Sequence, residues 1–364
     1  MTISERNLIW LDQFDFLSYN KKGKILKLFN IEEDIMANFA REKVQLSKIL
    51  TQQEYNTIYS NSDIEKLNET LDRYKARGIE IITLYSSNYP KLLHETNSPP
   101  FVLYCMGNLQ LLDTTSCAVV GTRKPSEYGR VSTKQFVQAL VNAGITIVSG
   151  LATGVDTIAH EMAIAENGST VAVIAGGFDH IYPATNKSLF KVMIQNNLVV
   201  TESKPEIFPQ AYMFPIRNRI IAGLSRAVLV TEAGKRSGAL HTKNYALAFN
   251  RDVFALPGRI NSPESEGTNA IIKECQSAIC LNPEEIISSL GVQDKNNFKK
   301  PAFQLDITEQ TILNYILAEK KSYQEIVDYT ELSPRELNTV LFNMQIKGYI
   351  DKLAGNNYIA LIKP

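Results

Sequence analysis

The residues whose types suit ligand binding are glycines and cations that follow short apolar, strand-like runs. Cys117–Val120 leads into Gly121-Thr122-Arg123, and Ile145–Val148 leads into Ser149-Gly150. Glycine allows the backbone to approach a ligand closely, and free amides at the start of a helix attract an anion. The planar guanidinium of an arginine matches the geometry of a phosphate. These turns, with a third at residues 175–177, predict a phosphate-binding edge.

Basic residues are concentrated between residues 204 and 251. Over this stretch eight Lys and Arg stand against two Glu, whereas the whole chain has 38 basic and 38 acidic residues and no net charge. Phe208, Tyr212 and Phe214 lie among these cations, and cations beside stacking rings suit single-stranded nucleic acid. The neutrality of the whole chain therefore does not exclude a nucleic-acid binder. For Arg217 and Arg219, a structural role in which they join loops is an alternative of equal weight to a DNA contact.

Three titratable residues raise the alternative of an enzyme, a Rossmann-like nucleotide hydrolase. Asp156 and His160 are four residues apart, so they would share one helix face, and Glu232 could act with them in acid–base chemistry. The sequence has no P-loop, no G-x-G-x-x-G and no P-G-G-x-G-T-x-x-E motif. We therefore expect Asp156 to cap a helix and His160 to pack in the interior, and we expect no catalysis.

The elements that must position these residues alternate between strands and helices. Helix-length amphipathic stretches at Glu127–Ala143 and Val155–Asn167 separate some of the short β-rich runs, a pattern that predicts an α/β fold with a doubly wound, parallel, Rossmann-like sheet over residues 81–290. Such sheets bind ligands at the carboxyl ends of their strands. The expected strands are Ile79–Leu84, Cys117–Val120, Ile145–Val148, Val171–Ala175, Leu198–Val200, Ala227–Val230 and Val253–Ala255.

The two ends of the chain predict separate, smaller domains. Residues 1–80 have helical periodicity and 291–304 have the composition of a linker, while 305–364 have the outline of a winged helix. The N-terminal domain is either a SAM-like or helix-hairpin-helix-like DNA contact or, as we favour, a packing or regulatory domain. The C-terminal domain, with nine basic and nine acidic residues over 291–364, favours protein contact over DNA recognition. A winged-helix DNA-binding regulator is the remaining alternative function.

The chain shows no export signal and no apolar run long enough to span a membrane. Its four cysteines form no C-x-x-C pair, which predicts reduced, mostly buried thiols and no metal site. We expect a cytoplasmic protein without a membrane partner.

Several long motifs in a fixed order resemble those of the DNA-processing protein A family (DprA, also called Smf). The matching words are VVGTRKPSEYG, IVSGLATGVDTIAH, AVIAGGFDHIYPATN, FPIRNRIIAGLS, TEAGKRSGALHT, and FALPG followed by EGTNAII. The resemblance implies an extended Rossmann fold that binds single-stranded DNA and loads RecA onto it in natural transformation and homologous recombination. It also implies a homodimer, single-strand-binding protein as a further partner, no cofactor and no catalytic residue.

The resemblance places the DNA contacts at particular residues of this sequence. Phe208 is expected as a stacking platform and Lys204 as its neighbour along the strand path. The full set is Gly121, Thr122, Arg123, Ser149, Gly150, Lys204, Phe208, Arg217, Asn218, Arg219, Lys235, Arg236, Ser237 and Gly238. The chain departs from the family pattern at Thr122 and Ala239, where Ser is frequent, and at 274–276, where Glu-Cys-Gln replaces a Gly-Ala pair.

Overall fold

The computed structural model describes residues 1–292, 305–317, 319–346, 349–353 and 355–360. The chain divides into two compact units, Met1–Gln293 and Asp294–Pro364. Most of the predicted linker, from residue 293 to 304, lies outside the described residues.

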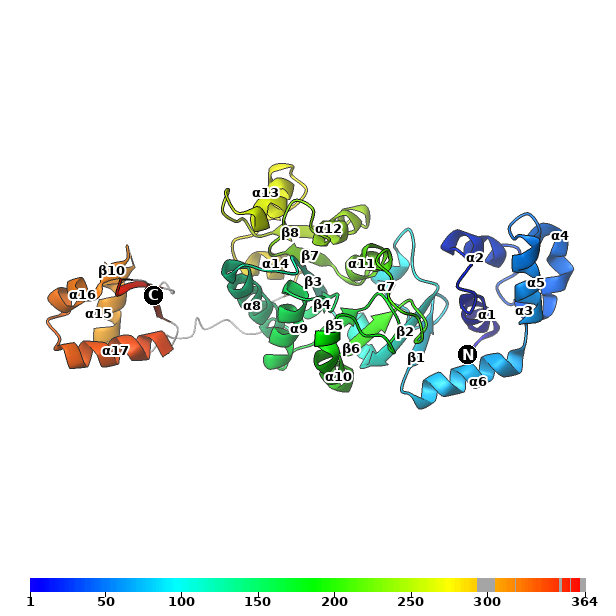
Figure 1. Ribbon diagram of the computed structural model, residues 1–364, viewed down its shortest axis with the longest axis horizontal. Coiled ribbons are helices and arrows are strands. Elements are labelled where there is room, and N and C mark those ends of the chain that lie inside the picture. Colours follow the sequence, from blue (N-terminus) through cyan, green and yellow to red (C-terminus); the bar gives the residue numbers. More distant parts are fainter. Residues whose placement is uncertain (293–304, 318, 347–348, 354, 361–364) are drawn as a thin grey trace. The chain divides into compact units, whose positions relative to one another are not determined.

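The first unit is built on a nine-stranded sheet in its described part (Figure 1). The strand order is β1-β2-β6-β5-β4-β3-β7-β8-β9. The strands are β1 (Glu80–Thr83), β2 (Val102–Gly107), β3 (Ser116–Val120), β4 (Thr146–Ser149), β5 (Thr170–Val173), β6 (Leu198–Thr201), β7 (Ala227–Val230), β8 (Asp252–Ala255) and β9 (Ala278–Ile279). All seven predicted strands are present, and the prediction missed β2 and β9.

One edge of the sheet is antiparallel, so the prediction of a wholly parallel sheet is wrong there. β2 pairs antiparallel with β6, with Tyr104 opposite Thr201, and β1 pairs antiparallel with β2. Parallel neighbours need a long crossover, usually a helix. Between β1 and β2 the chain has only the four-residue helix α7 (Lys91–His94), which is too short for one.

Helices cover both faces of the parallel strands because alternate residues of each strand point to opposite faces. Cys117 and Val119 of β3 pack with α8 (Glu127–Asn142), α9 (Val155–Ala165) and α14 (Pro283–Ser289). Ala118 and Val120 pack on the other face, with α11 (Met213–Leu224) and α12 (Ala239–Ala248). The central strand is thus buried on both sides, as its unbroken apolar sequence predicts.

The strand order reverses at β3. From β3 the chain builds β4, β5 and β6 outward on one side, and α11 then returns it to β7 on the other side. The loops after β3 and β7 therefore leave their strands in different directions. In doubly wound sheets, a reversal of this kind opens a crevice at the carboxyl ends of the strands.

The N-terminal helices share a hydrophobic core with the sheet. Trp10 and Phe39 are buried in the same cluster as Tyr104 of β2 and Val199 of β6, with α10 (Lys187–Asn196) packed beside them. The N-terminal helices are α1 (Ile3–Asp12), α2 (Tyr19–Leu26), α3 (Ile35–Asn38), α4 (Lys43–Leu46), α5 (Gln52–Ser60) and α6 (Ile64–Ala76). A domain boundary at residue 80 stays a prediction.

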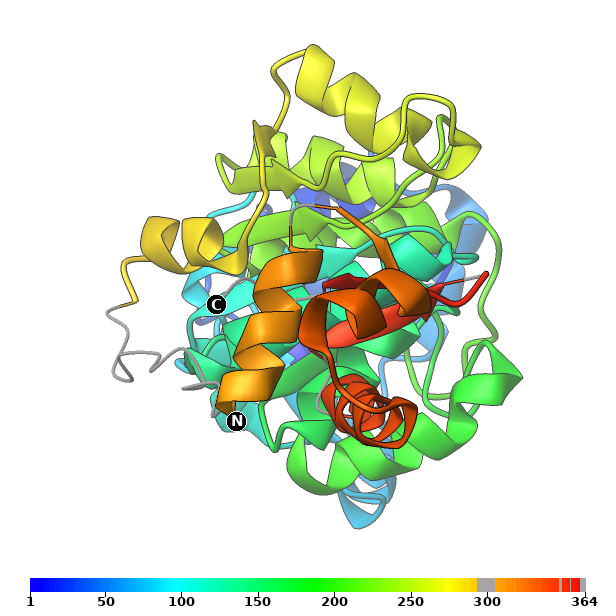
Figure 2. The ribbon, with the colours of Figure 1, turned by 90° about the vertical axis from the view of Figure 1, so that its left-hand side faces the viewer.

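The second unit contains three helices and three short strands in its described part (Figures 1 and 2). Ile312, Ile326 and Leu341 form its core, one from each helix. The elements are α15 (Ile307–Ile316), β10 (Lys321–Ser322), α16 (Tyr323–Thr330), α17 (Pro334–Ile346), β11 (Ile350–Leu353) and β12 (Asn357–Ala360), with strand order β10-β12-β11. This is the element order that the winged-helix prediction requires, and the assignment stays a prediction.

Candidate nucleic-acid interface

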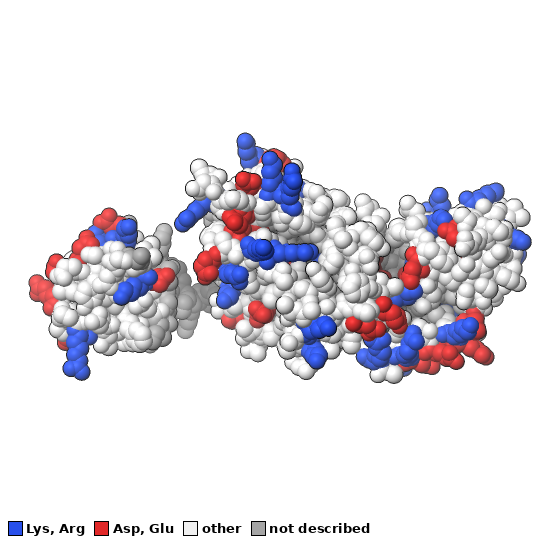
Figure 3. Space-filling view, in the orientation of Figure 1, with Lys and Arg blue, Asp and Glu red and all other residues white. Residues whose placement is uncertain are grey.

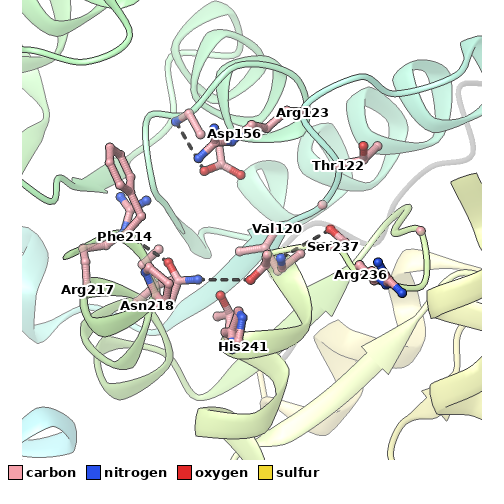
Figure 4. A pocket seen from close by; sticks show the side chains of 18 of the residues that line it. Val120, Thr122, Arg123, Asp156, Phe214, Arg217, Asn218, Arg236, Ser237 and His241 are labelled. Carbon is pink, nitrogen blue, oxygen red and sulfur yellow. Dashed lines mark hydrogen bonds between the residues drawn. The ribbon is translucent and has the colours of Figure 1, made fainter. Parts of the chain in front are cut away.

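A cleft of about 630 Å³ lies where the strand order reverses. The loop after β3 forms one wall, the loop after β7 forms another, and the first turns of α11 lie between them (Figure 4). We call this hollow the first cleft. Nine of the predicted DNA-contact residues line it: Gly121, Thr122, Arg123, Arg217, Asn218, Lys235, Arg236, Ser237 and Gly238.

The loop after β3 is shaped by a glycine that no larger residue can replace. A Cβ at Gly121 would lie 2.6 Å from the Val155 side chain and 2.9 Å from the carbonyl oxygen of Glu232. The Thr122 amide donates to that same carbonyl oxygen at 2.7 Å. This close approach fixes the start of the loop, so the exposed Arg123 is held at the cleft, with its guanidinium 5.7 Å from the Phe214 ring centroid.

Glu232 ties the loops after β3 and β7 together. The Ser126 amide donates to one carboxylate oxygen of Glu232 at 2.8 Å, and the Ser126 hydroxyl donates to the other at 2.6 Å. Ser126 also caps α8 by accepting from the Gly129 amide. A buried carboxylate beside the first turn of a helix is stabilised by the helix dipole as well as by these donors. Glu232 is therefore an anchor of the cleft.

The loop after β7 carries two exposed cations, Lys235 and Arg236. Neither forms an ion pair with any described residue. The Asn218 side chain of α11 donates to the Gly238 carbonyl at 3.2 Å and so joins this loop to α11 (Figure 4). Unpaired cations on an anchored loop are available to an anionic ligand.

A further exposed cation, Arg259, follows β8 and was missed by the sequence analysis. Its loop runs back to the loop after β7, where the Gly267 amide donates to the Ala233 carbonyl at 2.7 Å. The signal was present, because Arg259 follows an apolar strand just as Arg123 does. We define the cationic half of the carboxyl edge as Arg123, Lys124, Lys235, Arg236 and Arg259. On the face shown in Figure 3, Lys and Arg side chains over the upper part of the sheet unit are interspersed with Asp and Glu side chains.

Arg217 lies under the first cleft and is buried. Its guanidinium donates to the carbonyl of Gly150 at 2.6 Å and to that of Val173, so it joins the ends of β4 and β5. Burial lowers the pKa of Arg217 to about 10, and the neighbouring Asp156 opposes that shift. Ser149 is also fully buried, and its hydroxyl donates to the Val119 carbonyl at 2.7 Å. Arg217 therefore forms part of the floor of the first cleft, and Ser149 lies beneath that floor.

Exposed rings occupy the other part of the carboxyl edge. Phe208, in the loop after β6, is 61% exposed, and its centroid lies 5.3 Å from that of His180, in the loop after β5. The ring centroid of Tyr182 lies 5.5 Å from that of Phe214, at the start of α11. Tyr212 is 67% exposed. We define the aromatic half as His180, Tyr182, Phe208, Tyr212 and Phe214.

Lys204 and Arg219 lie outside the first cleft. Both line a second cleft of about 560 Å³ between the sheet and the N-terminal helices. The Lys204 ammonium group lies 2.8 Å from the Asp15 carboxylate, and Arg219 pairs with Glu202. The structure therefore places these two predicted contacts among structural ion pairs.

The three residues considered for acid–base chemistry are each engaged within the protein. Asp156 accepts from the amides of Gly150 and Ala152, at 3.1 and 3.4 Å. His160 is fully buried with its Nδ1 2.7 Å from the Thr170 hydroxyl, and burial lowers its pKa to about 3. Within the described ranges, no three His, Cys, Asp or Glu side chains gather as metal ligands, and no helix is long and apolar enough to cross a membrane.

The fold and the cleft define a doubly wound α/β protein whose ligand site lies at the reversal of its strand order. A model of the family named DNA recombination-mediator protein A matches residues 80–291. The chain belongs to this family, which confirms the resemblance found in the sequence motifs.

Individual relatives agree with this assignment. The chain is 34% identical to Protein Smf of Synechocystis over 326 residues, which cover 79% of this chain and 82% of the relative. It is 39% identical to the DNA processing protein DprA of Bacillus subtilis over 226 residues, or 62% and 76% of the two chains.

Two solved structures are similar in fold. The DprA protein of Streptococcus pneumoniae matches with a TM-score of 0.69 and 32% identity, over 79% of this chain and 98% of the other. The Helicobacter pylori protein matches with a TM-score of 0.53 and 33% identity, over 58% and 95%. The latter is described as having a unique single-stranded DNA binding mode. These neighbours confirm the predicted α/β fold class.

Proposed function

We propose that this chain binds single-stranded DNA along the carboxyl edge of its sheet and mediates recombination through that complex. The observation that carries the proposal is the division of one edge into a cationic and an aromatic half. Phosphates of a single strand are attracted to the unpaired cations, and its unstacked bases can lie on the exposed rings. The single-stranded DNA described for the Helicobacter pylori relative supports the same ligand.

In this proposal, the exposed residues among the predicted contacts touch the DNA, and the buried ones support them. Arg123, Lys235 and Arg236 are exposed and meet the phosphates, while Phe208 stacks on a base. Gly121, Thr122, Ser237 and Gly238 shape the walls. Arg217 and Ser149 act indirectly, because they are buried and hold the strand ends on which the walls stand.

The protein acts by binding, without a catalytic step. Asp156 lines the first cleft, but it is held by amides of the protein, and neither His160 nor Glu232 lines the cleft beside it as an acid–base partner. Hydrolysis of nucleoside monophosphates that is lost in Glu232→Gln would overturn this part of the proposal.

The partners proposed for the complex follow from the family. We propose that the DNA complex receives RecA in competition with single-strand-binding protein, and that the working form is a homodimer in the cytoplasm. A recombination mediator must give its strand to a recombinase, and the family name supports that role.

A salt-titrated binding assay with single-stranded and duplex DNA of the same mixed sequence tests the proposal. We expect tighter binding to the single strand, because the rings of the aromatic half can stack only on unpaired bases. Equal affinity for both forms would contradict it and would favour duplex binding by the C-terminal unit.

A further inference from the structure

We propose that the bound single strand continues beyond the first cleft, over the start of α11, into the second cleft and onto Lys24 and Lys27 at the C-terminal end of α2. This inference rests on the proposed function, because it extends the path of the same DNA strand. It gives the N-terminal helices a direct role in DNA binding.

The two clefts lie on opposite sides of the first turns of α11. Phe214 and Asn218 line the first cleft, whereas Met213, Ile216 and Arg219 line the second. The ridge between the clefts is apolar and exposed, since Tyr212 is 67% and Ile216 is 43% exposed. A strand that leaves the first cleft over this ridge enters the second.

The second cleft continues into a third hollow of about 470 Å³ on the N-terminal helices. Tyr19 and Phe101 line both, and their rings stack with centroids 4.5 Å apart. α11 and α2, which face one another in Figure 1, are joined by these shared walls. The second and third hollows therefore adjoin one another, and the start of α11 separates them from the first cleft.

The chemistry of the second cleft fits bases better than phosphates. Each carboxylate that lines it has a cationic partner, so the cleft attracts no net charge. The pairs are Asp12 with Lys22, Asp15 with Lys204, and Glu202 with Arg219. Bases are neutral and planar, and the aromatic residues Tyr19, Phe101, Tyr212 and Tyr245 line the cleft.

Free cations reappear in the third hollow. Lys24 and Lys27 line it and are exposed, and neither forms an ion pair with any described residue. Lys24 lies in α2 and Lys27 is the residue that follows its C-terminal end, whereas Lys21 and Lys22 of α2 are already paired with Glu54 and Asp12. Along the proposed path, cations in the first cleft are followed by rings in the second cleft and by cations again in the third hollow. This order is expected where a DNA strand contacts the protein with both its phosphates and its bases.

The test compares two oligonucleotides on the full chain, one of about 6 nucleotides, to fill only the first cleft, and one of about 20, to reach α2. The variant Lys24→Gln with Lys27→Gln should weaken binding of the long strand by about 10-fold at low salt and make its salt dependence shallower. Binding of the short strand should not change. The matched control, Lys66→Gln with Lys75→Gln, removes two exposed lysines of α6 and should leave both strands unaffected.

A second variant tests the ridge without changing charge. Tyr212→Ala should weaken the long strand more than the short one and leave the salt dependence intact, because it removes a stacking surface. Equal affinity of the wild-type protein for the two lengths, or no effect of the α2 variant on the long strand, would overturn the inference while leaving the proposed function standing. Failure of the proposed function is a separate result, in which the wild-type protein prefers neither strand over duplex DNA.

Discussion

The cationic and aromatic halves of the carboxyl edge belong to one sheet, yet they offer different chemistry to a ligand. The loops after β3, β7 and β8 carry exposed Arg and Lys that pair with no carboxylate in the part of the chain that the structure describes, whereas the loops after β5 and β6 and the start of α11 carry rings. Phosphates of any nucleic acid satisfy the first half, but only unpaired bases satisfy the second. Under the proposed function, general affinity for nucleic acid and selectivity for single strands therefore come from different loops.

The two halves are also anchored differently. In the cationic half, buried Glu232 holds Ser126 within the sheet unit's own loops. In the aromatic half, the loops after β5 and β6 are held from outside the sheet, since Asp179 pairs with Arg77 and Glu206 accepts from Tyr74 of α6 at 2.8 Å. The position of the rings therefore depends on the N-terminal helices, and that of the cations does not.

Charge reversal in the cationic half has the largest expected effect. Lys235→Glu with Arg236→Glu should weaken single-strand binding about 100-fold at 50 mM salt, because two phosphate contacts become repulsive. The slope of log affinity against log salt should become shallower by at least about 1.4, at about 0.7 per contact. Arg226→Glu, just before β7 at the opposite end of that strand, is the control. An unchanged slope would remove these residues from the DNA path.

A lower pH should reduce the free energy of unfolding of the sheet unit that carries both halves. His160 has a folded pKa of about 3 against 6.5 for the free side chain, and its Nε2 has no partner among the described atoms. Between those values the unfolded chain holds one more proton, so this group's contribution to the free energy of unfolding falls as the pH falls, by about 1.4 kcal/mol per unit. At pH 5 the loss is about 2 kcal/mol relative to pH 6.5.

Urea unfolding at the two pH values measures this loss. The His160→Gln variant should lack this part of the pH dependence. An identical pH dependence in the variant would mean that His160 is not the group responsible.

Removal of one ring from the aromatic half comes next. Phe208→Ala should weaken single-strand binding about 10-fold, near the lower end for a base stacked on an aromatic side chain. The salt slope should stay the same, since no charge is lost, and Phe208→Trp should restore binding. A parallel loss of affinity for duplex DNA would contradict the assignment of selectivity to this half.

The smallest expected change in affinity comes from Glu206, which links the loop that carries Phe208 to α6. Arg73 and Glu206 form an exposed pair, 60% and 45% exposed, and such pairs contribute less than about 1 kcal/mol. Glu206→Ala should therefore change affinity by only about two-fold. A double-mutant cycle with Phe208→Ala should show coupling of about 0.5 kcal/mol, whereas strict additivity would mean that α6 does not position the ring.

Local patterns were sufficient for most of the sheet. Most of the apolar runs that predicted strands are buried along their whole length, and Ala227–Val230 matches β7 at both ends. β2 was missed although Val102–Cys105 is an apolar, buried run like the others, and only its antiparallel pairing with β6 depended on a distant partner. The clustering of Gly121, Arg123 and Lys235 was predictable for a related reason, because the carboxyl ends of parallel strands share one edge.

The burial of Arg217 and Arg219 could not be predicted from the sequence. Both arginines were predicted at the DNA path from a single motif, and the structure buries both on different sides of α11. Two positions apart on a helix is about 200°, so neighbouring motif residues face different environments. Their partners are distant in the chain, since Val173 ends β5 and Glu202 follows β6.

Local chemistry and a period of two specify most of the strands, the glycines that follow them and the excess of cations in residues 204–251. Which cations remain free, where the rings gather and which hollows share walls follow from the three-dimensional packing. Those properties depend on contacts between segments far apart in the chain, and burial of a charge is settled by the groups that pack around it.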